Sequence, residues 1–158
     1  MSRLSTILLR IILVVVLLGT LLVQVLLVFQ ANATGQQYPE VEYLVVPYAA
    51  ASVGAVALMQ IALCAVWRLL SMVAGAGVFT APALKWVNVV ITCAAAISAL
   101  SLLVFVHWIV IAQIGGPGMF LLLGACVVLG SALTLFLIVM RDLLRTAIND
   151  RSELAQVI

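Results

Sequence analysis

Five polar side chains interrupt the long apolar stretches of this sequence at positions that could support binding chemistry. They are Gln60, Ser98, Ser101, Ser131 and Thr134. They fall at similar distances from the ends of their apolar segments, so they could meet at mid-depth in a helical bundle. Amide and hydroxyl groups gathered there would form a pocket for a small polar ligand or an ion. The same residue types also make interhelical hydrogen bonds, typically below about 1–2 kcal/mol each, and we favour this packing role.

His107 is the only histidine, and histidine side chains can ligate metals or carry protons. Either role would need a carboxylate, a second histidine or a cysteine nearby, whereas only Gln113 is polar in this part of the chain. The neighbouring Trp108 instead favours a position at the outer headgroup level, where amphipathic rings are common. Trp67 and Trp86 mark the inner headgroup level in the same way.

The reactive side chains argue against several membrane activities. A proton-coupled exporter needs a carboxylate at membrane depth, yet all acidic residues lie in links or in the tail: Glu40, Glu42, Asp142, Asp150 and Glu153. A single histidine is too few for a di-haem electron carrier. The cysteines are scattered in depth without a CxxC pair, which argues against a thiol oxidase, and they are Cys64, Cys93 and Cys126. We therefore expect no enzyme, no metal and no cofactor.

The elements that must position these residues are four long apolar segments. Of the 158 residues, 67% are apolar and only 8% are charged, which is far from the composition of a soluble domain. A helix needs about 20 apolar residues to cross a bilayer. Runs of that length predict helices at about 7–29, 48–70, 82–114 and 119–140. The expected fold is an all-α, integral membrane four-helix bundle, up-down-up-down, that forms a single domain over residues 1–158.

The links between these helices differ in character. Residues 30–47 form the only sizeable outer loop, and Gly115–Gly118 is a short turn on the same side. Before the third helix, Thr80 and Pro82 are typical of a cap and a first-turn proline. Small residues four apart favour close helix contact at Ala50 and Gly54, Ala51 and Ala55, and Ala95 and Ala99. The first helix lacks such a face, so we expect it at the periphery.

All seven basic residues fall on one side of this topology: Arg3, Arg10, Arg68, Lys85, Arg141, Arg145 and Arg151. Basic residues near helix ends stay preferentially in the cytoplasm, so we expect both termini there. The excess of Arg over Lys, with richness in Ala, Val and Leu, indicates a GC-rich bacterial genome, and we expect the protein in the bacterial cytoplasmic membrane. Ala31, Asn32 and Ala33 have the form of a signal-peptidase site. The preceding apolar stretch exceeds a signal core of about 7–15 residues, so we favour an uncleaved helix and keep cleavage as the alternative.

The last predicted segment is an amphipathic cytoplasmic tail at residues 141–158. No proline follows Pro117 and no glycine follows Gly130, so the fourth helix could continue into this tail. The tail places apolar residues on one broad face: Leu143, Leu144, Ala147, Ile148, Leu154, Ala155 and Ile158. Such a face requires a protein partner or the lipid surface.

Two short motifs resemble those of a known family. The stretch Gly75–Thr80 leads into Ala83–Val87, and the tail ends in Ser152–Ile158. With the four spans, these motifs resemble domain of unknown function 2975, a family of small bacterial membrane proteins, over nearly the whole chain. The family's tail usually carries an acidic pair before its final Val-Ile, which Arg151 and Ser152 interrupt here. The family has no established activity. Some members are thought to be encoded beside a small helix-turn-helix repressor, which implies a regulatory or membrane-anchoring association.

These features favour an uncharacterised inner-membrane protein with a non-enzymatic interaction or regulatory role. Its expected partners are the lipid bilayer and, through the tail, a cytoplasmic protein such as a small helix-turn-helix regulator. The alternative is a small-molecule permease or ligand-binding membrane protein with a pocket at the level of Gln60. A homo-oligomer stays open, because small-residue faces pair between chains as readily as within one. A formal charge of +2 provides no basic field for direct nucleic-acid binding.

Overall fold

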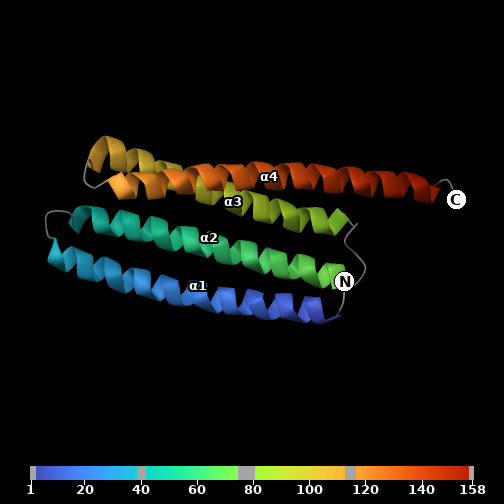
Figure 1. Cartoon of the computed structure of the whole chain (residues 1–158), viewed down its shortest axis with the longest axis horizontal. Helices are drawn as coiled ribbons and strands as arrows, with labels where there is room; N and C mark the ends of the chain where they lie inside the picture. The colour runs from blue at the N-terminus through green and yellow to red at the C-terminus, as the bar shows by residue number, and fades with distance from the viewer. Residues whose placement is uncertain (1–2, 39–41, 75–80, 113–116, 157–158) are drawn as a thin grey trace.

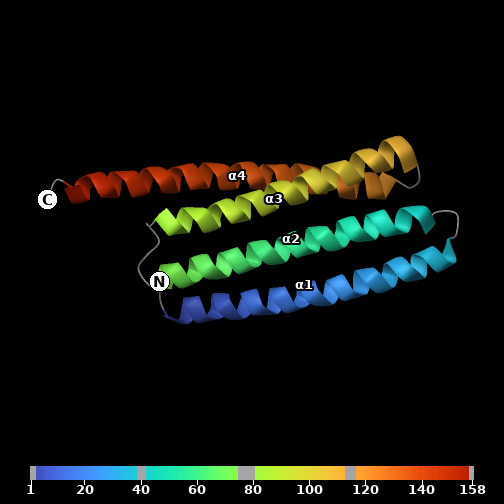
Figure 2. The ribbon, with the colours of Figure 1, turned by 180° about the vertical axis from the view of Figure 1, so that it is seen from behind.

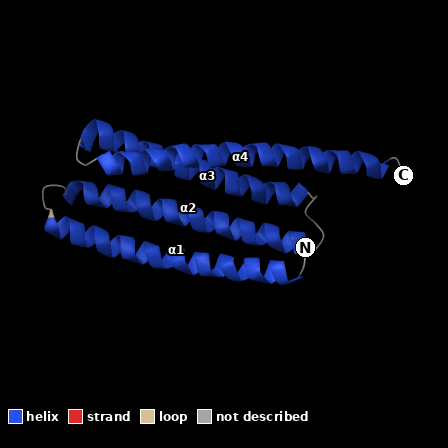
Figure 3. Cartoon of the chain, in the orientation of Figure 1, coloured by secondary structure: helices blue, strands red, loops and turns tan. Residues whose placement is uncertain are grey.

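The protein consists of four long helices. The structure is a computed structural model that describes residues 3–38, 42–74, 81–112 and 117–156 (Figure 1). The helices are α1 (Arg3–Gln37), α2 (Glu42–Ala74), α3 (Ala81–His107) and α4 (Pro117–Gln156). A π-helical turn, η2 (Trp108–Ala112), directly continues α3. No strand occurs among the residues described (Figure 3), and the predicted all-α class is confirmed.

Each helix contains a stretch that is long and apolar enough to cross a membrane. The candidate spans are Thr6–Gln37, Glu42–Met72, Pro82–Val110 and Phe120–Asn149. At a rise of 1.5 Å per residue, a hydrocarbon core of about 30 Å takes up about 20 residues. The chain is therefore a multi-pass transmembrane protein whose helices continue beyond the hydrocarbon.

The helices form an up-down-up-down bundle in which each helix packs against its neighbours in sequence. Within the described ranges, helix contacts join α1 to α2, α2 to α3, and α3 to α4, and no other pair of helices. Figures 1 and 2 show α1, α2 and α3 side by side, with α4 crossing one face of α3. The bundle is thus an open row rather than a closed ring. α1 lies at one edge of this row, which agrees with its predicted peripheral position.

The outer loop predicted at residues 30–47 is largely helical, so that prediction was wrong in extent. α1 continues to Gln37, and α2 already begins at Glu42. The backbone N–H of Tyr38 donates to the carbonyl of Thr34 at 3.0 Å, which closes the last turn of α1. The predicted ends followed the loss of apolar residues, whereas backbone hydrogen bonds can continue into polar sequence outside the hydrocarbon. Pro47 lies inside α2, in its second turn, where it removes only one backbone donor.

The other predicted ends also shift. The third helix was expected at 82–114, but its α-helical part ends at His107 and gives way to η2. Of the predicted link turns, Thr80 and residues 115–116 lie outside the described residues, while Pro117 begins α4. α4 runs without a break from Pro117 to Gln156, so the predicted continuation of the fourth helix into the tail is confirmed.

α1 contacts α2 through a seam whose residues recur alternately every four and every three positions. The less exposed residues of this seam are Thr6, Arg10, Leu13, Leu17, Thr20, Gln24, Leu27 and Ala31. Such spacing is typical of helices that cross at about 20° in a left-handed pair. Between the seam positions apolar side chains stay exposed, such as Val15 at 62% and Leu22 at 61%. These side chains face the bilayer, where lipid tails solvate them.

Candidate functional site

The predicted mid-depth polar residues lie on different helix faces. The Gln60 side chain on α2 donates from Nε2 to Oε1 of Gln24 on α1, at 2.9 Å. Gln24 in turn donates from its Nε2 to the backbone carbonyl of Val53 at 3.3 Å. Gln60 is therefore engaged at the α1–α2 interface, with a partner that the sequence analysis did not single out.

The predicted hydroxyl residues mostly bond to the backbone of their own helices. Ser98 Oγ donates to the carbonyl of Ala94, and Thr134 Oγ1 donates to the carbonyl of Gly130. Ser131 Oγ donates to the carbonyl of Val128 and is exposed. Ser101 is partly buried on α3. Since α2 and α4 make no contact in the described ranges, Ser131 and Thr134 do not join Gln60 in one cluster, and Ser98 lies against Gly130 on α4.

A second polar pair lies near the opposite end of α3 from the basic residues. Tyr48 on α2 and His107 on α3 form a hydrogen bond of 2.8 Å between the phenol oxygen and Nδ1. Their rings meet edge to face, with centroids 5.7 Å apart and an interplanar angle of 77°. From the sequence alone, this partner of His107 was not predicted. The antiparallel order of the second and third helices was the available signal, because it places the start of one beside the end of the other.

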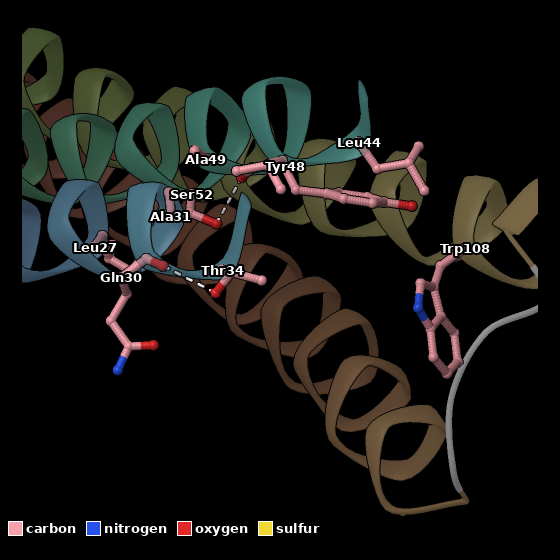
Figure 4. A pocket seen from close by; sticks show the side chains of 10 residues that line it. Leu27, Gln30, Ala31, Thr34, Leu44, Tyr48, Ala49, Ser52 and Trp108 are labelled. Atoms are coloured by element: carbon pink, nitrogen blue, oxygen red, sulfur yellow. Dashed lines mark hydrogen bonds between the residues drawn. The ribbon is translucent and has the colours of Figure 1, made fainter. Parts of the chain in front are cut away.

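A cavity of about 330 Å³ lies between α1, α2 and η2 at this end of the row, which we call the outer end; the cavity is named the outer cavity (Figure 4). Its lining residues are Leu27, Gln30, Ala31, Thr34, Leu44, Val45, Tyr48, Ala49, Ser52 and Trp108. The hydroxyls of Thr34 and Ser52 bond to backbone carbonyls of their own helices. In Figure 4 the amide of Gln30 points away from the other lining side chains. The cavity is therefore a mainly apolar site, with Tyr48 and Trp108 as its large aromatic walls.

The other end of the row carries arginine side chains that link neighbouring helices. The guanidinium of Arg10 on α1 lies 5.8 Å from the ring centre of Trp67 on α2. Arg68 on α2 lies at the same distance from the ring of Trp86 on α3. These distances fall within the range of cation–π attraction. We call this end, with Arg10, Arg68 and Arg141, the basic end.

Arg141 completes the series at the basic end by joining α4 to α3. Its Nη1 donates to Oδ1 of Asn88 on α3 at 3.4 Å, and its Nη2 forms an ion pair of 2.8 Å with Asp142. Every pair of neighbouring helices is thus joined by one arginine at this level. Trp67 and Trp86 were predicted at this level from the sequence, but their pairing with arginines was not.

Groups that could hold a metal ion or react as thiols are sparse in the described helices. No group of three or more His, Cys, Asp or Glu side chains with metal-binding potential is found there. The cysteines are free; Cys93 is buried, whereas Cys64 and Cys126 are exposed. The arrangements that the structure does bring together are thus the Gln24–Gln60 and Tyr48–His107 pairs, the mainly apolar outer cavity and the basic end.

Comparisons with known proteins find one family. The family described as protein of unknown function DUF2975 matches residues 29–158, which include the end of α1 and all of α2, α3 and α4. No curated protein matches the chain. No solved structure matches it either.

Proposed function

The chain belongs to the DUF2975 family of proteins of unknown function, and from this premise we propose that it is a non-enzymatic interaction or regulatory protein. We further propose that it resides in a bacterial cytoplasmic membrane with both termini in the cytoplasm. Support for this orientation comes from the basic end, where Arg10, Arg68 and Arg141 mark one side of the membrane. Basic residues of this kind are retained in the cytoplasm during insertion.

The observation that carries the interaction role is the length of α4. α4 contains 40 residues, which correspond to about 60 Å of helix, whereas the hydrocarbon core takes up about 30 Å. α3 is the only helix that contacts α4 in the described chain. The carboxyl end of α4 projects past the ends of the other helices (Figure 1). This extension is available to a partner on the cytoplasmic side.

The extension also has the pattern of a partner-binding helix. Leu143 is 58% exposed, and Leu144 and Ile148 are partly exposed on a side of α4 that also contains Ala147. Apolar residues one turn apart on an otherwise polar helix are typical of helices that dock into a hydrophobic groove. The partner we propose is therefore a cytoplasmic protein with such a groove. The family resemblance makes a small helix-turn-helix regulator the first partner to examine.

Deletion of residues 148–158 tests this role. The truncated chain and an Ile148→Gln variant should lose the same cross-linked cytoplasmic partner in pull-downs from cells. Arg145→Gln is the matched control, because Arg145 is exposed on the extension but polar, and it should keep that partner. An unchanged partner set in the truncated chain, with membrane levels equal to the unmodified protein, would refute the proposed role of the extension.

A ligand-binding or permease role is the second candidate, and the outer cavity supports it better than the level of Gln60 does. The amide of Gln60 is bonded to Gln24, whereas the outer cavity of about 330 Å³ is within the size range of ligand sites. Ala49→Leu would fill this cavity and should abolish ligand binding or flux. Gln60→Leu should leave ligand binding or flux intact and cost only modest bundle stability. If Gln60→Leu abolishes ligand binding or flux and Ala49→Leu does not, the ligand site lies at the level of Gln60 instead.

A further inference from the structure

The basic end contains a groove that no α4 residue lines. Its volume is about 360 Å³. α1 and α2 provide most of its lining, and Trp86 of α3 completes it, although α1 and α3 make no contact with each other in the described ranges. The lining residues are Leu13, Val14, Leu17, Leu63, Cys64, Trp67, Arg68 and Trp86. Because the helices form an open row, this groove faces the membrane rather than a closed interior.

The groove carries positive charge without a compensating acid. Arg68 is one of its lining residues, and Arg10 lies against Trp67, another lining residue. The one ion pair found among the described side chains joins Arg141 to Asp142, on α4. Neither Arg10 nor Arg68 is therefore neutralised by a carboxylate of the described chain.

Arg10 also has a donor without an acceptor. Its Nε atom is buried and has no hydrogen-bond partner in the described structure. Arg10 lies within the candidate span Thr6–Gln37, close to its start, so this donor is held at the boundary between headgroups and hydrocarbon. A buried donor that lacks an acceptor is destabilising, and more so when it is charged. The Nη atoms of the same guanidinium are not among these buried atoms, so they are the donors that an anion from the membrane surface can reach.

We propose that this groove binds an anionic phospholipid of the leaflet at the basic end. The headgroup phosphate accepts hydrogen bonds from Arg10 and Arg68, since guanidinium groups match phosphate oxygens in pairs. One acyl chain lies along the apolar wall formed by Leu13, Leu17 and Leu63. Basic pockets between transmembrane helices on the cytoplasmic side are typical sites for anionic headgroups. The complementary charge and the adjoining apolar groove together select a lipid over a soluble anion.

Tryptophan quenching by brominated lipids tests the proposal directly. In a Trp108→Phe background, Trp67 and Trp86 are the only tryptophans, and both line the groove. The purified protein is reconstituted with increasing fractions of dibrominated phosphatidylglycerol or dibrominated phosphatidylcholine. We expect phosphatidylglycerol to quench at a several-fold lower fraction than phosphatidylcholine. Equal quenching curves for the two lipids would overturn the proposal.

Charge-removing variants locate the lipid. Arg10→Gln and Arg68→Gln should each weaken the preference for phosphatidylglycerol by about fivefold, the factor that corresponds to about 1 kcal/mol per basic residue at an anionic surface. The matched control is Arg145→Gln, which removes the same charge from the exposed extension of α4. If the control lowers the preference as much as the groove variants do, the attraction is general and the site is refuted.

A salt titration of the protein with its arginines unmodified is a test that does not depend on how the variants fold. Raising the salt concentration from about 0.1 M to about 1 M shortens the screening length from about 10 Å to about 3 Å. The preference for phosphatidylglycerol should then fall several-fold, whereas quenching by phosphatidylcholine should stay the same. A preference that is insensitive to salt would contradict a phosphate held by arginine. None of these outcomes bears on the proposed partner of α4, because the groove includes no residue of that helix.

Discussion

At the residue scale, Gly130 marks a close approach between α3 and α4, the closest at any of the described glycines. A Cβ atom added to Gly130 would lie 2.6 Å from Oγ of Ser98 and 3.7 Å from its Cα. Glycine at this position lets the two backbones approach, as small residues do at many membrane interfaces. The small-residue pairs predicted from sequence lie elsewhere: Ala95 and Ala99 are exposed, and a Cβ on Gly54 would meet nothing within 4 Å.

Gly130→Ala should destabilise the bundle. The added methyl must displace Ser98 or separate α3 from α4, and such overpacking costs about 1–3 kcal/mol. Gly19→Ala is the matched control, because a Cβ on Gly19 meets nothing within 4 Å. That control should be neutral or stabilising by about 0.5–1 kcal/mol, since alanine favours a helix over glycine. Unfolding in mixed detergent and SDS micelles measures both changes, and equal effects of the two substitutions would contradict the close contact.

The Gln24–Gln60 hydrogen bond is a second residue-scale feature with a measurable energy. A double-mutant cycle with Gln24→Leu and Gln60→Leu should give a coupling of about 0.6 kcal/mol, and at most about 2 kcal/mol. The same unfolding assay yields this coupling from the two single variants and the double variant. A coupling of zero would mean that the two amides do not bond across α1 and α2 in the membrane.

At the element scale, the helices are longer than the bilayer requires. The helix extensions at the two ends of the row differ in what they pack against. At the outer end, α1 and α2 continue side by side, and their extensions line the outer cavity. At the basic end, α4 extends furthest, and among the described helices only α3 is its neighbour. Its extension carries exposed apolar residues such as Leu143. Helix formation there depends on the continuous backbone rather than on packing.

Hydrogen exchange should distinguish the two parts of α4. Amides of residues 143–149 should exchange at least about tenfold faster than those of residues 125–139, because segments with few packing contacts open locally at low free energy. Exchange of the purified protein in lipid nanodiscs, read by mass spectrometry, provides this comparison. Uniform protection along the whole helix would show that the extension is already covered, by lipid or by a second copy of the chain.

At the scale of the whole molecule, the open row leaves little of the chain's apolar surface inside. The buried residues among those described are Leu13, Leu44, Ala65, Leu70, Ala83, Ile91 and Cys93, and none of the described polar residues is buried. Lipid tails, or copies of this chain, must cover the remaining apolar faces. The arginine contacts at the basic end are among the few polar contacts that join neighbouring helices.

Labelling with a membrane-impermeant maleimide tests the proposed orientation. A single cysteine at Tyr38 should react from outside intact cells, whereas one at Arg145 should react only after permeabilisation. Cys64, Cys93 and Cys126 are replaced by alanine first, because two of the three are exposed in the isolated chain. Labelling of the Arg145 position in intact cells would reverse the proposed topology, since basic ends are retained in the cytoplasm.

The amino-acid sequence by itself determined that lipid surrounds the helices of this protein and that the number of spans is four. Apolar runs of about 20 residues indicate helical spans, because backbone N–H and C=O groups in hydrocarbon must be bonded within the protein and a helix bonds them within one segment. The same logic predicted α4 to continue past Arg141, since no breaker follows. It could not place the helix ends near Gln37 and Glu42, because hydrogen bonding within a helix does not stop where apolar residues stop.

Only the tertiary structure decided which polar side chains meet. Gln60 could have faced any neighbour, and its pairing with Gln24 depends on the rotation of α1 and α2 about their axes. The same holds for the bond of His107 to Tyr48. Rotation is set by many weak contacts across each interface, none of which leaves a strong periodic signal in helices that are apolar on all sides. The open order of the row, and with it the groove at the basic end, followed from those contacts.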